Sequence, residues 1–188
     1  MAAVRGDPAG RQVRGARAPA ASYALRALGV ALVALLSGCG FHLRAAVDLP
    51  AQMDVVYVQG APALGELGRE ITRSLESAGS RQTEERASAT AILVIDRNEV
   101  RRRVLSVNRS GQVNEYELTY HLAFEVRNPE GKVLVPRQSV SLARDYTFDP
   151  NSVLAKGNEE AQLRGDMIGF AVRQMLRRID SALKQAGR

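Results

Sequence analysis

Apolar and polar side chains alternate along residues 115–127. Successive side chains of a β-strand point to opposite faces of the sheet, so a period of two predicts a strand with one buried face and one face in water. Ala123 interrupts the polar set. The apolar positions, which we expect to face the core, are Tyr116, Leu118, Tyr120, Leu122, Phe124 and Val126.

Three further segments have the composition of strands: residues 53–59, 91–107 and 133–148. The second is either one long strand or two halves joined at a bulge, and Pro136 indicates an edge or a bulge in the third. Polar turns at residues 109–112 and 128–131 connect the last three strands, which predicts a meander of two hairpins.

Two segments show the period of a helix instead. Residues 64–78 carry apolar side chains every three or four positions, beginning with Leu64 and ending before Gly79. Gly65 and Gly68 lower the helix propensity of the first turns.

The second predicted helix runs from about residue 158 to residue 185. Acidic residues lie near its beginning and basic residues near its end, as the helix dipole favours. Its apolar stripe, which we expect to face the core, comprises Leu163, Met167, Ile168, Phe170, Ala171, Met175, Ile179 and Leu183.

The predicted order of elements is β-α-β-β-β-α. It favours an α+β fold, a two-layer sandwich in which a four-stranded mixed sheet carries two helices on one face. We expect residues 1–38 to be a cleaved leader, residues 39–52 a linking segment and residues 53–188 a single domain.

The leader is predicted from residues 27–36, an apolar run of ten residues preceded by five arginines and one aspartate. A helix that spans a membrane needs about 20 apolar residues, so this run fits a secretory signal. Ser37 and Gly38 then precede Cys39, the only cysteine of the chain. This is the pattern of a bacterial lipoprotein signal.

Cys39 is therefore the expected site of lipid attachment, with an S-diacylglycerol and an N-acyl group. One acyl chain binds a membrane only marginally, so several chains are needed for stable anchoring. Gly40 stands where lipoproteins retained at the inner membrane typically carry aspartate, which favours the outer membrane. If Cys39 were instead a small buried thiol, the leader that precedes it would have no explanation.

The net charge of +6 owes much to the leader. Of 26 basic and 20 acidic residues, the leader holds five and one, so residues 39–188 hold 21 and 19, a net charge of +2. A nucleic-acid partner therefore has little support.

Catalytic and metal-binding patterns are absent from the sequence. One cysteine and two distant histidines, His42 and His121, do not form a zinc motif. His121 falls on the polar face of the alternating strand, where we expect a solvated or paired side chain. No nucleophile or phosphate-loop motif occurs, so we expect no enzyme, no metal and no cofactor besides the lipid on Cys39.

Arginine residues are more informative. Arg101, Arg102 and Arg103 are consecutive within a predicted strand, so they cannot all face one way. One interpretation is a solvated sheet face balanced by glutamates on neighbouring strands. The other is an anion site in which guanidinium groups bind lipid phosphates.

Three separated motifs resemble one known family. Residues 39–44, Cys-Gly-Phe-His-Leu-Arg, resemble the Cys-Gly-aromatic-His-Leu-Arg opening of the LptE family, once called rare lipoprotein B. Residues 109–116 resemble its Arg-Asn-Gly-Gln-x-x-Glu-Tyr turn and strand, and residues 154–160 its Leu-Ala-Lys-x-Asn-Glu helix entry. The three occur in the family's order.

The resemblance implies a four-stranded sheet with two helices, in a lipoprotein that plugs the LptD β-barrel of the outer membrane in a one-to-one complex. It implies assistance in assembling that barrel and binding of lipopolysaccharide, with Arg109 and Lys156 as the matching basic residues. The chain departs from some members of the family by ending soon after the last helix. The alternatives are a lipoprotein that binds another envelope partner and a lipid-transfer or hydrolytic enzyme.

Overall fold

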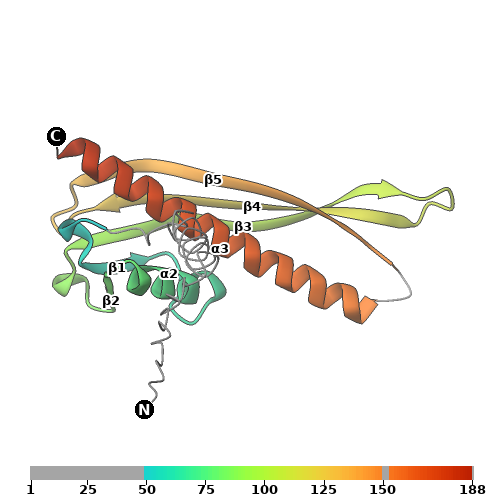
Figure 1. Ribbon diagram of the computed structural model, residues 1–188, viewed down its shortest axis with the longest axis horizontal. Helices are drawn as coiled ribbons and strands as arrows, with labels where there is room; N and C mark the ends of the chain where they lie inside the picture. The colour runs from blue at the N-terminus through green and yellow to red at the C-terminus, as the bar shows by residue number, and fades with distance from the viewer. Residues whose placement is uncertain (1–48, 150–152, 188) are drawn as a thin grey trace, which may run out of the picture. The chain divides into compact units, whose positions relative to one another are not determined.

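The three longest strands form two consecutive hairpins (Figure 1). They are β3 (Ala91–Val107), β4 (Val113–Arg127) and β5 (Val133–Thr147), and β4 pairs antiparallel with both of its neighbours. The computed structural model describes residues 49–149 and 153–187, without the side chains of residues 153–156. Both predicted hairpin turns are confirmed, at residues 108–112 and 128–132.

A shorter parallel region precedes the hairpins. A 3₁₀ turn (Ala51–Met53) leads into β1 (Val55–Gln59), which is followed by α2 (Glu66–Ser77), β2 (Arg81–Thr83) and a second 3₁₀ turn (Arg86–Ser88). β1 is parallel to both β2 and β3, so the strand order is β2-β1-β3-β4-β5.

The mixed sheet therefore has five strands, and the prediction of four was wrong by one. The missed strand, β2, has the sequence Arg-Gln-Thr, which shows no apolar alternation. It lies at the edge of the sheet and is defined by its pairing with β1. The predicted first strand also begins later than expected, at Val55, because residues 51–53 form the 3₁₀ turn.

β3 is one continuous strand that contains a bulge. Both interpretations of the sequence, one long strand and two halves joined at a bulge, therefore describe part of it. Ile95 lies opposite Phe124 of β4, but Arg97 lies opposite Ala123, so Asp96 is an extra residue. An extra residue reverses which positions face the core. Odd-numbered residues of β3 face the core before Asp96, and after it the even-numbered residues from Asn98 to Val104 lie opposite the core positions of β4.

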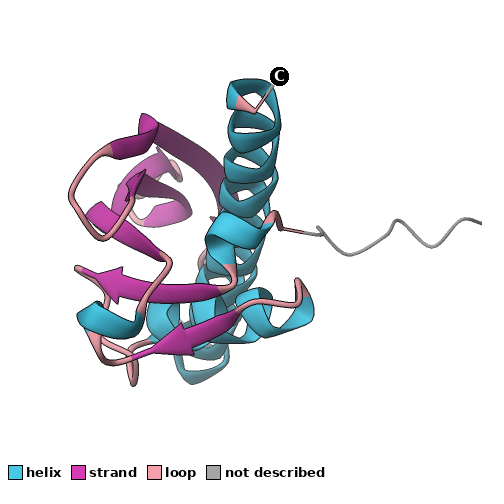
Figure 2. Cartoon of the chain, turned by 90° about the vertical axis from the view of Figure 1, so that its left-hand side faces the viewer, coloured by secondary structure: helices cyan, strands magenta, loops and turns pink. Residues whose placement is uncertain are grey.

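Both helices cover one face of the sheet, as predicted (Figure 2). The alternation of β4 is confirmed, because Leu118, Tyr120, Leu122, Phe124 and Val126 are fully buried. They share one core with α2 and with α3 (Val153–Ala186). The helical side chains in this core include Leu67, Ile71 and Leu75 of α2 and Met167, Ala171, Met175 and Ile179 of α3.

Three details of the helices differ from the prediction. α2 begins at Glu66, which leaves Leu64 in the preceding loop and exposed. α3 begins at Val153, about one turn earlier than expected. Phe170 is also exposed. At 100° per residue, Phe170 lies about 60° beyond the arc that the buried side chains of α3 occupy.

Gly68 allows the loop before α2 to pack against the helix. A Cβ atom at this position would lie 2.0 Å from the carbonyl oxygen of Pro62, which is backbone and cannot move aside. The same carbonyl accepts a hydrogen bond of 2.9 Å from the amide of Gly65. The glycine that weakens the helix locally is therefore required by this close approach.

We expect Gly68→Ala to lower the free energy of unfolding by about 1–3 kcal/mol, because the added methyl group overlaps the Pro62 carbonyl. Gly157→Ala is the matched control, since Gly157 is also in a helix but has no atom within 4 Å of an added Cβ. The control should raise stability by about 0.5–1 kcal/mol. Urea unfolding measures both, and equal stabilisation by the two changes would contradict this account.

Candidate functional site

Arg109 lies at the apex of the β3–β4 hairpin. The turn is held by Asn108, whose side-chain oxygen accepts hydrogen bonds from the amides of Ser110 (2.9 Å) and Gln112 (3.0 Å). Gly111 supplies the positive φ of 77° that closes the turn. Arg109 is exposed and forms no ion pair with any side chain that the structure describes. Its guanidinium group is therefore available to an external anion.

Two of the other predicted site residues cannot be placed. Lys156 is in the first turns of α3, but its side chain lies outside the described residues. Cys39 lies outside them altogether, as does His42. The expected contact of Lys156 with lipopolysaccharide and the lipidation of Cys39 therefore stay predictions.

The three consecutive arginines of β3 divide between the two faces of the sheet. Arg101 forms an ion pair with Glu99 at 2.6 Å, and Arg103 forms one with Glu117 of β4 at 2.6 Å. The hydrogen bonds from Arg101 and Arg103 lower the pKa of the Glu99 and Glu117 carboxyl groups respectively. Arg101 and Arg103 therefore fit the first interpretation, a solvated sheet face whose charges are balanced by glutamates.

Arg102 points to the opposite face, where it meets α3. Its guanidinium nitrogen Nη1 lies 2.9 Å from Oε2 of Glu160, and the same oxygen accepts a hydrogen bond of 2.6 Å from the hydroxyl of Tyr146. The guanidinium carbon lies 4.7 Å from the centre of the Tyr116 ring, within the range of cation–π attraction. One carboxylate thus links β3, β5 and α3.

Aromatic rings complete this contact. The Tyr116 ring lies 5.7 Å from that of Tyr146 in a stacked arrangement and 5.3 Å from that of Phe148 in an edge-to-face arrangement. We call Arg102, Tyr116, Tyr146, Phe148 and Glu160 the Glu160 cluster. It fixes the N-terminal half of α3 against the base of the projecting hairpin.

The pKa values in the cluster reflect its geometry. Partial burial raises the pKa of Glu160, but the hydrogen bonds from Tyr146 and Arg102 and the nearby positive charges outweigh burial and lower it overall. Burial, and then the hydrogen bond to Glu160, raise the pKa of Tyr146 to about 12. The cluster therefore holds a carboxylate and a neutral phenol near neutral pH.

His121 lies on the outer face, opposite Glu99 of β3 and Ser141 of β5. A groove of about 380 Å³ runs beside it, lined in part by Arg97 and Arg137. Arg137 forms an ion pair with Asp96 at 3.1 Å. This is the solvated or paired environment that the alternation predicts for His121.

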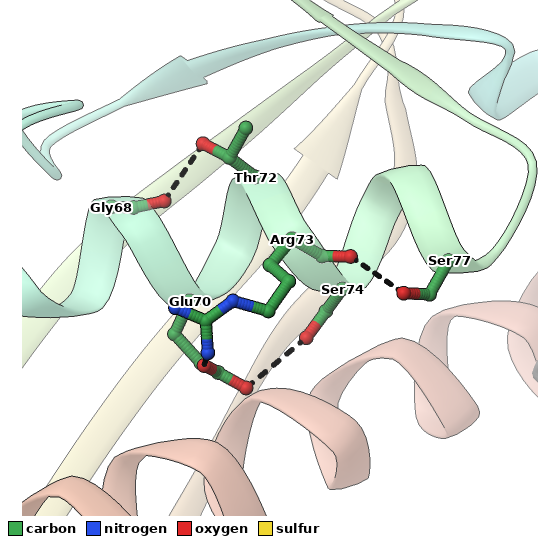
Figure 3. Close-up of polar contacts among 6 residues, drawn as sticks. All are labelled: Gly68, Glu70, Thr72, Arg73, Ser74 and Ser77. Atoms are coloured by element: carbon green, nitrogen blue, oxygen red, sulfur yellow. Dashed lines mark hydrogen bonds and ion pairs between the residues drawn. The ribbon is translucent and has the colours of Figure 1, made fainter.

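A cleft of about 710 Å³ lies among α2, α3 and β5. Its charged lining has both signs: Glu66, Arg69, Glu70, Arg73, Arg144, Asp166 and Arg173. Glu70 accepts hydrogen bonds from Arg73 (2.9 Å) and Ser74 (3.4 Å) on the side of α2 that faces α3 (Figure 3). Periodicity along the sequence predicted the apolar sides of these helices but not this charged cleft, which forms only when they pack.

Three observations concern what the described residues do not contain. No group of three or more His, Cys, Asp or Glu side chains is close enough among them to hold a metal ion. The residues that line the 710 Å³ cleft include no Ser, Thr, Cys or His. Within the same described region, no helix combines the length and hydropathy needed to cross a membrane.

We expect Glu160→Gln to lower stability near neutral pH, because the charged pairing with Arg102 is lost. The folded-state pKa of Glu160 lies below its ordinary value of 4.5, so its stabilising effect is present above that value and is lost as the pH falls through the folded-state pKa. The stability difference between the natural protein and the variant should therefore shrink in acid. Urea unfolding across the acid range measures it.

Glu130→Gln, in the exposed β4–β5 turn, is the control and should change stability little at any pH. A Glu160→Gln protein as stable as the natural one at pH 7 would show that the cluster does not hold α3 in place.

Comparison with known proteins agrees with this architecture. The family model described as LptE, lipopolysaccharide-assembly, matches residues 53–179. The LPS-assembly lipoprotein LptE of Pectobacterium atrosepticum is 29% identical over 154 residues, which cover 81% of this chain and 82% of that protein. The LptE of Photorhabdus laumondii is 27% identical over 164 residues, covering 86% and 88%.

Solved structures show the same fold. The solution structure of lipoprotein B from Nitrosomonas europaea has a TM-score of 0.63 and 33% identity, and the match covers 79% of this chain and 94% of that one. The crystal structure of rare lipoprotein B from Shewanella oneidensis has a TM-score of 0.61 and 24% identity, with coverage of 71% and 99%. The family match extends over well more than half of the sequence, and the predicted resemblance to this family is confirmed: this chain belongs to the LptE family of lipopolysaccharide-assembly lipoproteins.

Proposed function

We propose that this protein is an outer-membrane lipoprotein that plugs and helps to assemble the LptD β-barrel, and that it binds lipopolysaccharide for insertion into the outer leaflet. The observation that carries the proposal is the LptE family match over residues 53–179. The description of the family names lipopolysaccharide assembly and no chemical reaction, which supports a role without catalysis.

The outer face of the sheet supports a position inside a barrel. The lumen of a membrane β-barrel is polar, so a plug needs a charged surface of mixed sign. Ion pairs of Glu99, Glu117 and Glu125 with neighbouring arginines give the outer face such a surface. A plug of one barrel implies a one-to-one complex.

Arg109 and Lys156 are the proposed contacts to lipopolysaccharide. A guanidinium group can donate two parallel hydrogen bonds to a phosphate, and a lysine adds a point charge. The apex position of Arg109, without an ion-pair partner among the described side chains, supports its part in this proposal. Lys156 is included in the proposal only because it matches the family motif.

The anchor on Cys39 completes the proposal. Acyl chains on this residue would hold the protein at the periplasmic side of the outer membrane, where it meets the barrel. The contacts with the barrel would then keep it in place, so the lipid is a secondary tether.

Co-purification tests the partner. When the protein is extracted from outer membranes with detergent, we expect a large β-barrel protein to accompany it in equal amount, because a plug is enclosed by its barrel. Gel filtration and mass spectrometry of the complex measure the ratio and the identity. Quantitative recovery of the lipoprotein alone would indicate another envelope partner and would overturn the plug.

Charge reversal tests the ligand site. We expect Arg109→Glu combined with Lys156→Glu to weaken lipopolysaccharide binding by at least about tenfold, because charge-assisted hydrogen bonds to phosphate become repulsions. Arg127→Glu with Lys132→Glu is the control, since it makes the same change in net charge at the opposite end of β4. Equal affinity of both double variants would refute the assignment of Arg109 and Lys156.

A further inference from the structure

Exposed aliphatic side chains gather at the end of β3. Among the described residues, six large apolar side chains are exposed, and three of them are Val104 (49%), Leu105 (42%) and Val107 (57%). The others, Leu64, Val133 and Phe170, lie singly on other elements. Single exposed apolar residues are ordinary on protein surfaces, whereas a group of them marks an interaction site.

The hairpin becomes a two-stranded ribbon only at its end, because Tyr116, opposite Val104, still pairs with Tyr146 of β5. Pairing of β5 with β4 ends at Glu115, so Val107 and Val113 face each other without a third strand beside them. In Figure 1 the end of the hairpin projects past both β5 and the beginning of α3. A two-stranded ribbon is marginally stable in water unless another surface covers it.

The pairing of the strands distributes the aliphatic side chains along the ribbon. Val104 lies opposite Tyr116 and Val107 opposite Val113, whereas Leu105 is the unpaired residue of a second bulge. We call Val104, Leu105 and Val107 the aliphatic strip. At about 3.3 Å per residue the strip is about 10 Å long.

A positive charge lies at each end of the strip. Arg109 is two residues beyond Val107, at the apex. Arg102 is two residues before Val104, over the Tyr116 ring, and its charge is neutralised by Glu160. A free cation at the outer end of an apolar surface matches an amphiphile that has an anionic head group and hydrocarbon chains.

We propose that the aliphatic strip binds acyl chains of the same lipopolysaccharide molecule whose phosphates bind Arg109. This inference rests on the proposed function, since it assigns a second part of one ligand to the same hairpin. Hydrocarbon in contact with the strip removes three exposed side chains from water, and the cation at the apex sets the direction in which the ligand lies.

The test compares two probes: intact lipopolysaccharide, and lipopolysaccharide from which all acyl chains have been removed while the phosphates remain. The variant is Val104→Thr, Leu105→Thr and Val107→Thr together, because threonine is polar and has the β-branched shape that strands favour. Val133→Thr is the matched control, a 46% exposed aliphatic residue on β5. The full chain, purified from membranes, is used throughout, and thermal unfolding checks that each variant is folded.

We expect the triple variant to bind intact lipopolysaccharide about tenfold more weakly, as loss of apolar contact predicts, and to bind the deacylated probe as the natural protein does. Arg109→Gln should weaken binding of both probes, and Val133→Thr should change neither. If the triple variant does not fold, Leu105→Thr alone should give a smaller loss that is again confined to the intact probe.

Unchanged binding of intact lipopolysaccharide by the folded variants would overturn the aliphatic strip while the proposed function stands. Failure of the natural protein to bind either probe would overturn lipopolysaccharide binding itself. A triple variant that retains both affinities but no longer co-purifies with a β-barrel would assign the strip to the barrel wall instead, and would overturn the inference.

Discussion

The alternation of side chains along β4 is the constraint on which the rest of the structure depends. β4 is the central strand of the meander and pairs with both β3 and β5, so its apolar face can be buried only if β3 and β5 present apolar residues in register and helices cover all three. Full burial of a large apolar side chain contributes about 1.5–3 kcal/mol. The five fully buried residues of β4 therefore contribute strongly to the stability of the sheet.

The bulge at Asp96 follows from the same constraint. Ile95 occupies a core position opposite Phe124, and a strict period of two would continue with odd-numbered residues, which include Arg101 and Arg103. One extra residue reverses the alternation, so these two arginines reach the outer face, where glutamates neutralise them. Of the three arginines, only Arg102 then faces α3, where it forms an ion pair with Glu160. The charge pattern of both faces is thus decided by a single unpaired residue.

The β3–β4 hairpin connects this fold to its function. Along most of its length it is part of the sheet that the helices cover, whereas beyond its pairing with β5 it is a two-stranded ribbon that carries Arg109. The Glu160 cluster lies at the boundary between the two parts and fixes the hairpin to α3. A rigid base and an uncovered end suit the proposed binding, in which the hairpin remains folded while it presents a cation and aliphatic side chains to a large ligand.

The sequence by itself determined the parts that depend on local periodicity: the alternation of β4, both hairpin turns, the two helices and their side of the sheet, and the basic residue at the first turn. The motif resemblance identified the family. Tertiary structure alone decided the rest, because each case depends on how segments pack in space and not on local periodicity. β2 exists through its pairing with β1, and Gly68 is required by the carbonyl of Pro62. Arg102 is placed by a bulge and by Glu160, 58 residues away, and Phe170 is exposed because the packed arc of α3 ends before it.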